Sequence, residues 1–172
     1  LWRRMSEASI RILLLLACCA GLVSCGFQLR GSEGSNLALH QVHVSATNAY
    51  GEMQQELERG LTESGVTLLP DVAPYTVRLL TERTARRAVA STASNTVSDY
   101  EIRSEVVFDL VDAGGQVVIP ETRLFAERIY TSGNASLVSR SREEGLLIEE
   151  MRTEIAGQLI RRIDAAVRGR VR

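Results

Sequence analysis

The sequence VSDYEIRSEVVFDLVDAGGQVVIP, residues 97–120, determines the fold through the alternation of its side chains. Large apolar residues share one parity, namely Tyr100, Ile102, Val106, Phe108 and Leu110. Charged residues take the other parity, at Arg103, Glu105 and Asp109. A period of two residues is typical of a strand that rests one face on a core and exposes the other to water. The pattern therefore predicts a long, half-buried strand over residues 96–112.

The segments on either side of this strand predict two more strands. Gly114 and Gly115 form a hairpin turn signal, which predicts a following strand over residues 116–130. Pro120 interrupts that strand and cannot donate to a ladder, so we expect a bulge or another irregularity there. On the other side, residues 75–90 predict a strand that a polar tip separates from the first one. Together the three strands predict a meander.

Two further stretches have helical periodicity. In the first, Asn48 is the expected N-cap and Gly65 the expected stop. Its apolar stripe consists of Tyr50, Met53, Leu57 and Leu61. The second helix is expected over residues 135–166, with Asn134 as its cap and Gly145 as a point where it bends or weakens. Its stripe consists of Ile148, Met151, Ile155, Leu159 and Ile163.

These elements predict an α+β fold. A short strand over residues 41–46 precedes the first helix, so the order is strand, helix, meander, helix. We expect two helices packed on one face of a four-stranded mixed sheet. Residues 40–172 are expected to form this single domain, which is long enough to bury a core of its own.

Composition excludes several classes of function. The chain has 20 arginines, no lysine and a formal net charge of −1, which argues against binding nucleic acid. His40 and His43 point to opposite sides of a strand, and no nucleophile elbow or phosphate loop is present. We therefore expect a protein that is not an enzyme and needs no cofactor, metal or disulfide.

The N-terminal segment predicts export and lipid attachment. Residues 12–23 carry no charge and are too short to span a membrane, which needs about 20 apolar residues. Arg3, Arg4 and Arg11 precede this run, and the choice between a start at Leu1 and one at Met5 affects only the segment that is discarded. Leu22-Val23-Ser24-Cys25 resembles a bacterial lipobox, in which the cysteine is acylated and becomes the first residue. We expect a cleaved signal peptide over residues 1–24, with Cys25 as the lipid attachment site of a tether over residues 25–39.

Three motifs in matching order resemble the LptE family of lipopolysaccharide-assembly lipoproteins. They are CGFQLRG directly after the lipobox, the strand pair at residues 97–120, and EEMRTEIAGQLIRRI at residues 149–163. The resemblance covers nearly all of the chain after the lipobox. It implies a non-catalytic lipoprotein of the Gram-negative outer membrane that faces the periplasm. The absence of aspartate after Cys25 also resembles lipoproteins sent to that membrane.

The resemblance also implies partners. Members of the family plug the LptD β-barrel, sit largely within its lumen and bind lipopolysaccharide during its insertion into the outer leaflet. The alternative is a periplasm-facing outer-membrane lipoprotein that acts as a protein-binding scaffold and does not bind lipopolysaccharide. Binding of purified lipopolysaccharide would discriminate between the two.

Four arginines are candidates for contact with lipopolysaccharide. Arg140 occupies the place of a basic residue that the family carries before its closing helix. Arg83, Arg86 and Arg87 lie on the strand that leads to the polar tip, where the chain departs from the family pattern. Their guanidinium groups suit phosphate, although pairing with acidic residues on the returning strand is an alternative. In a regular strand Arg83 and Arg87 point to the core side, so without a bulge this half of the strand must project beyond the helices.

Overall fold

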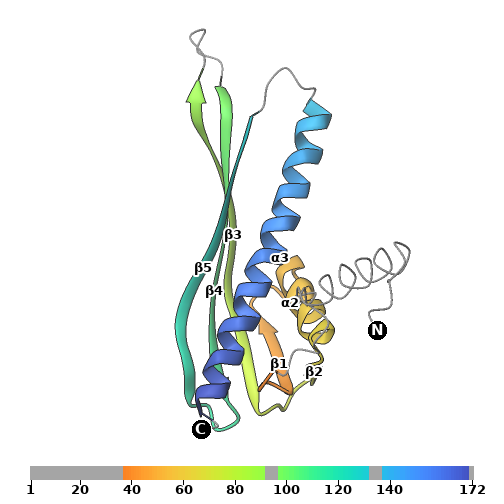
Figure 1. The fold of residues 1–172 in the computed structure, drawn as a ribbon, viewed down its shortest axis with the longest axis vertical. Coiled ribbons are helices and arrows are strands. Elements are labelled where there is room, and N and C mark those ends of the chain that lie inside the picture. Colours follow the sequence, from red (N-terminus) through yellow and green to blue (C-terminus); the bar gives the residue numbers. More distant parts are fainter. Residues whose placement is uncertain (1–36, 92–96, 132–136, 171–172) are drawn as a thin grey trace, which may run out of the picture. The chain divides into compact units, whose positions relative to one another are not determined.

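The computed structural model describes residues 37–91, 97–131 and 137–170, and all elements in them belong to the unit Gly34–Arg172. The elements are β1 (Gln41–Ala46), α2 (Glu52–Glu63), β2 (Thr67–Leu68), β3 (Tyr75–Ser91), β4 (Val97–Asp112), β5 (Val117–Thr131) and α3 (Leu137–Arg170). Figure 1 shows β3, β4 and β5 running side by side, with α2 and α3 lying along the sheet. The signal peptide and tether predicted before residue 40 lie almost entirely outside the described residues.

The sheet is mixed, as predicted, and has the order β2-β1-β3-β4-β5. β1 is parallel to both β2 and β3, whereas β3, β4 and β5 form the expected antiparallel meander. The sheet has five strands instead of four because two residues, Thr67 and Leu68, pair with Gln41 and Val42. The α+β fold class with two helices is confirmed.

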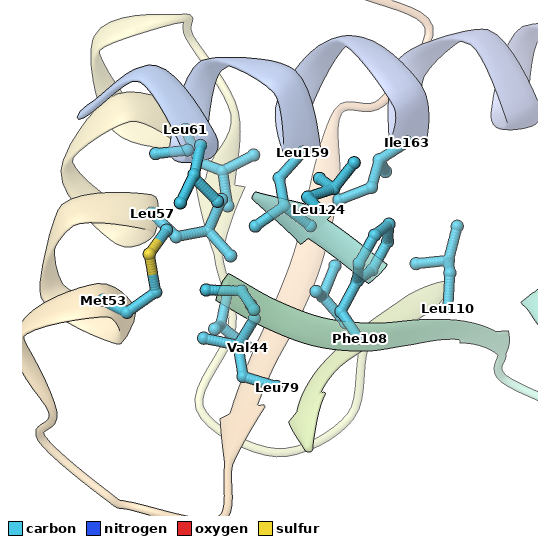
Figure 2. Packing of buried hydrophobic residues seen from close by; sticks show 14 of the residues in the cluster. Val44, Met53, Leu57, Leu61, Leu79, Phe108, Leu110, Leu124, Leu159 and Ile163 are labelled. Atoms are coloured by element: carbon cyan, nitrogen blue, oxygen red, sulfur yellow. The ribbon is translucent and has the colours of Figure 1, made fainter. Parts of the chain in front are cut away.

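The core lies between the helices and the face of the sheet that carries the even-numbered residues of β4. Figure 2 shows side chains from α2, α3 and four strands meeting there. Phe108, Leu57 and Leu159 are completely buried at its centre. The apolar stripes predicted for the two helices supply most of the helical contribution, including Met53, Leu61, Met151, Ile155 and Ile163. Burial of these stripes holds α2 and α3 on one face of the sheet.

A β-bulge in β3 reverses the facing of the side chains that follow it, up to the next register shift after Ala88. Leu79 pairs with Phe108 and Thr81 pairs with Val107, so Leu80 is an extra residue. Beyond the bulge Arg86 lies opposite the buried Ile102 and faces the helices. Arg83 and Arg87 would point to the core side only in a regular strand; the bulge, which the sequence analysis left open as the exception, turns them to the other face.

The irregularity predicted at Pro120 is confirmed. The β4–β5 register shifts between Phe108, which pairs with Thr122, and Leu110, which pairs with Ile119. Beyond the shift the even residues of β5 face inward, and Leu124 is 7% exposed. The shift lets β5 bury Ile119 on one side of Pro120 and Leu124 on the other.

The first helix begins later than the sequence predicts. Its N-cap is Gly51, not Asn48, and no side chain caps it. Tyr50, expected in the apolar stripe, precedes the helix with a φ of 66° and is 85% exposed. Gly65 ends the helix as expected, with a φ of 82° that glycine adopts readily.

The second helix is one continuous element. α3 has 34 residues and runs through Gly145 to Arg170, four residues further than predicted. The expected cap Asn134 lies outside the described residues. Neither of the helices that the structure describes is both long and apolar enough to cross a membrane.

Candidate functional site

A polar cluster joins the outer half of β3 to α3, and Arg86 is at its centre. The bulge at Leu80 turns Arg86 towards the helix, where its Nη1 donates to Oε2 of Glu144 at 2.8 Å. The hydroxyl of Tyr130, on β5, donates to the same oxygen at 3.1 Å. Three elements of the fold thus bring two donors to one carboxylate oxygen.

Two tyrosines support this cluster from the sheet. Tyr100 and Tyr130 are partners in the β4–β5 register, and their rings stack with centroids 5.7 Å apart. The guanidinium of Arg86 lies over the Tyr100 ring, 5.0 Å from its centroid, as a cation–π contact requires. Burial raises the pKa of the Tyr130 hydroxyl; Arg86 opposes this and Glu144 adds to it, so the net pKa is raised. The hydroxyl therefore remains a donor near neutral pH.

Arg140 lies on the same side of α3 as this cluster. It precedes Glu144 by one helical turn, and residues four apart on a helix are neighbours on its surface. Arg140 is half-buried, whereas Arg142 is exposed. The structure thus places Arg86, predicted from a distant part of the sequence, in contact with Glu144, and Arg140 one helical turn before Glu144.

Arg83 and Arg87 lie on the opposite face of the sheet. Arg87 is the register partner of Glu101 and donates to its two carboxylate oxygens at 2.7 and 3.0 Å. This is the cross-strand pairing that the sequence left open as an alternative to ligand binding. Arg83 is exposed and forms no ion pair with any residue in the described part of the chain. The four candidate arginines therefore do not form one site.

This outer face also carries apolar residues that the sequence analysis did not select. Phe125 is 46% exposed and Ile129 is 67% exposed. The guanidinium of Arg103 lies 4.0 Å from the centre of the Phe125 ring and also pairs with Glu127. Neither α2 nor α3, the two described helices, covers this face, so among the described residues its mixture of aromatic, aliphatic and arginine side chains is available to a partner. The odd parity of Phe125 and Ile129 is the signal that would have identified it.

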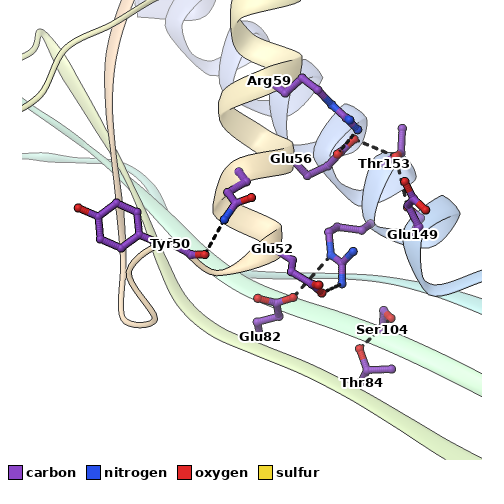
Figure 3. Close-up of polar contacts among 11 residues, drawn as sticks. Tyr50, Glu52, Glu56, Arg59, Glu82, Thr84, Ser104, Glu149 and Thr153 are labelled. Carbon is purple, nitrogen blue, oxygen red and sulfur yellow. Dashed lines mark hydrogen bonds and ion pairs between the residues drawn. The ribbon is translucent and has the colours of Figure 1, made fainter. Parts of the chain in front are cut away.

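A second polar region lies where the β3 bulge faces the start of α2. A cleft of about 900 Å³ opens there and is lined by Tyr50, Glu52 and Glu82, among others. Figure 3 shows Glu52 and Glu82 approaching each other across the cleft. Arg152 of α3 pairs with Glu52 and has its Nε 3.9 Å from Glu82. The arrangement joins three elements through one guanidinium.

Nearby polar contacts complete the joint between the helices and the sheet. Thr84 and Ser104 hydroxyls lie 3.1 Å apart on the inner face of the sheet. Thr153 donates to Glu56 at 2.8 Å, and Figure 3 shows Arg59 at the same carboxylate. No group of three or more metal-ligand side chains occurs in residues 37–91, 97–131 and 137–170. The Thr84–Ser104 and Thr153–Glu56 contacts join different elements, whereas the Arg59–Glu56 pair lies within α2.

The chain matches a known protein family. The model of the family described as LptE, lipopolysaccharide-assembly, matches residues 39–163. The LPS-assembly lipoprotein LptE of Yersinia enterocolitica is 27% identical over 162 residues, covering 89% of this chain and 75% of that protein. The family match includes β1, α2, the whole meander and α3 as far as Ile163.

Solved structures share the fold. The rare lipoprotein B of Shewanella oneidensis superposes with a TM-score of 0.68 at 22% identity, over 77% of this chain and 98% of that one. Lipoprotein B of Nitrosomonas europaea gives a TM-score of 0.68 at 21% identity, over 81% of this chain and 91% of that one. At these identities the likeness concerns the arrangement of the elements.

Proposed function

The chain belongs to the LptE family of lipopolysaccharide-assembly lipoproteins, and from this premise we propose that it binds lipopolysaccharide and plugs the LptD β-barrel. In this proposal it acts without catalysis and helps to assemble the barrel. It then contacts the glycolipid during insertion into the outer leaflet. The observation that carries the proposal is the placement of two arginines: Arg86 on β3 faces α3, and Arg140 lies on α3.

The chemistry of this region suits a phosphorylated glycolipid. Arg86 is about half exposed, with 51% of its side-chain surface accessible, and is oriented by Tyr100 and Tyr130. Guanidinium groups bind phosphate through paired, charge-assisted hydrogen bonds. We propose that Arg86 and Arg140 contact phosphates of lipopolysaccharide from this side.

The outer face of the sheet supports a second contact. Arg83 has no ion-pair partner in the described part of the chain, and Arg87, with 72% of its side-chain surface accessible, pairs with Glu101 of β4. With Phe125 and Ile129 they form an exposed surface of arginine, aromatic and aliphatic side chains. We propose that this surface meets either lipopolysaccharide or the lumen wall of the barrel.

The location follows from the N-terminal motif. We propose that residues 1–24 are removed and that Cys25 carries the lipid anchor. Residues 25–39 then tether a domain over residues 40–172 to the periplasmic side of the outer membrane. Several acyl chains on one cysteine would hold the domain stably, whereas one chain binds a membrane only weakly.

Two charge reversals on α3 test the lipopolysaccharide site. Arg140→Glu is expected to weaken binding of purified lipopolysaccharide, because it replaces attraction for phosphate with repulsion, while the melting temperature stays nearly unchanged. Arg142→Glu, two residues away and about 200° around the helix, is the matched control. Equal affinity of both variants and the parent at low salt, where charge effects are least screened, would contradict the assignment.

Two experiments, taken together, distinguish this function from the scaffold alternative. Co-purification of the chain with an outer-membrane barrel is expected under both functions. Direct binding of lipopolysaccharide by the purified chain is expected only under the proposed one. A chain that retains a barrel partner but binds no lipopolysaccharide would be a scaffold.

A further inference from the structure

Two hydrogen-bond donors from different strands converge on one oxygen at the hairpin. Arg86 Nη1 and the Tyr130 hydroxyl lie 2.8 and 3.1 Å from Oε2 of Glu144. A guanidinium and a hydroxyl aimed at a single oxygen are suited to an oxyanion. We propose that Arg86 and Tyr130 form a binding site for a phosphate group, and that Glu144 is a built-in competitor that occupies this site until the phosphate displaces it.

The donors keep their positions when the carboxylate leaves. Arg86 rests on the Tyr100 ring at 5.0 Å, and Tyr100 stacks on Tyr130 at 5.7 Å. Both tyrosines belong to strands of the sheet, and Tyr130 is only 5% exposed. These contacts do not involve Glu144, so the site is preorganised for another anion.

The contact with Glu144 is weak enough to be displaced. Side-chain exposure is 51% for Arg86 and 24% for Glu144, so solvent screens the pair. Ion pairs of this kind contribute about 1 kcal/mol or less. A phosphate monoester carries up to two negative charges and three strong acceptor oxygens, and therefore competes effectively with one carboxylate. Rotation of the Glu144 side chain is sufficient to vacate the site.

The identity of the ligand rests on the proposed function, whereas the anion site does not. A free phosphate and the phosphate of a lipid headgroup offer the same group to Arg86 and Tyr130. In the proposed function this phosphate group belongs to lipopolysaccharide. Glycolipids with little negative charge would then fail to displace the Glu144 carboxylate. Binding of inorganic phosphate tests the site, and binding of lipopolysaccharide tests its source.

The test compares two neighbouring carboxylates in the full chain purified in detergent. Glu144→Gln keeps the shape of the side chain and removes the competing charge, and Glu144→Ala removes the side chain. Glu143→Ala changes the net charge equally at an exposed position. We expect both Glu144 variants to bind inorganic phosphate about fivefold more tightly than the parent by calorimetry, since the ion pair that no longer competes with phosphate contributes about 1 kcal/mol. Glu143→Ala is expected to change affinity less than twofold.

Further variants locate the gain. Adding Arg86→Ala to Glu144→Gln should abolish the increase in phosphate affinity, and adding Tyr130→Phe should reduce that increase. An equal gain in the Glu143 and Glu144 variants would reduce the effect to net charge and overturn the site. A gain that survives Arg86→Ala would also overturn it. Melting curves of each variant verify that the compared proteins are folded.

Lipopolysaccharide and its dephosphorylated form identify the source of the phosphate. If the Glu144 variants bind lipopolysaccharide more tightly than the parent does, but not its dephosphorylated form, this would support the lipid phosphate as ligand. A gain for inorganic phosphate alone would overturn the lipid assignment and retain the anion site. If the parent and all variants fail to bind lipopolysaccharide, the proposed function fails, whereas the phosphate measurements still decide the site.

Discussion

Replacing Gly60 with alanine tests how closely α2 packs against α3. A Cβ placed on Gly60 would lie 2.9 Å from Cδ1 of Ile160, nearer than the roughly 3.5–4.0 Å at which carbon atoms attract. Two effects oppose each other. Alanine is favoured over glycine within a helix by about 1 kcal/mol, whereas overpacking typically costs about 1–3 kcal/mol.

The net change in the free energy of unfolding depends on how easily Cδ1 of Ile160 can move away from the new Cβ. Cδ1 is the end of a flexible, half-buried side chain, so the cost should be near the lower limit. Gly60→Ala alone is therefore expected to change the free energy of unfolding by less than about 0.5 kcal/mol. In an Ile160→Val background, which lacks Cδ1, the same change should stabilise the protein by about 1 kcal/mol. The coupling in this double-mutant cycle is then also about 1 kcal/mol.

Urea unfolding followed by circular dichroism measures all four proteins of the cycle. Gly145→Ala in α3 is the control, because an added Cβ there meets no atom within 4 Å and should stabilise by about 1 kcal/mol in either background. If Gly60→Ala stabilises both backgrounds equally, the coupling is zero. That result would refute the close approach of α2 and α3.

Four other outcomes are expected. Leu159→Ala should lower the free energy of unfolding by about 2–5 kcal/mol in urea, whereas Leu146→Ala at a 61% exposed site should change it by less than about 0.5 kcal/mol. Arg87 lowers the pKa of Glu101, and the backbone N–H of Gln116 lowers the pKa of Asp112. A carboxyl group whose pKa is lowered by folding stabilises the protein above its unfolded-state pKa, and this stability is lost as the pH falls through the folded-state pKa. The melting temperature should therefore decrease below about pH 4. Chelator or reductant should leave the unfolding midpoint unchanged, and a large shift with either would argue against folding without metal or disulfide. Mass spectrometry should find an acylated N-terminal cysteine, whereas a Cys25→Ala protein that is still processed and tightly membrane-bound without LptD would exclude this anchor.

Sequence periodicity predicted the elements in which the pattern of buried side chains continues without interruption. In β4 every even residue from Tyr100 to Leu110 faces the helices, so the alternation gave this facing correctly. The other face is not exposed throughout, because Val107 and Asp109 are each only 8% exposed. The helical stripes were equally regular, and they identified the residues that α2 and α3 bury. Where an element has a uniform period and one buried face, composition and spacing are sufficient.

The arginine sites depended on features that spacing does not encode. Leu80 is half-exposed and has no local signal that marks it as an extra residue. The register shift becomes evident only from the pairing of Leu79 and Thr81 with β4. Glu144 reaches Arg86 across 58 residues of sequence, and this contact requires the tertiary fold. Similarly, the cap at Gly51 replaced the one expected at Asn48 because the chain turns once more before the helix begins.

The bulge in β3 has an evolutionary consequence. Since one extra residue decides which face the following side chains occupy, inserting or deleting a single residue between Thr81 and Arg86 would move Arg86 to the opposite face of the sheet. Changes of two residues would lengthen or shorten the hairpin and leave both faces intact. Selection on this hairpin should therefore tolerate length changes in steps of two, or single steps compensated by loss or gain of a bulge. Positions in related chains are then comparable by the face they occupy, and an alignment column alone is an unsafe guide to equivalent arginines.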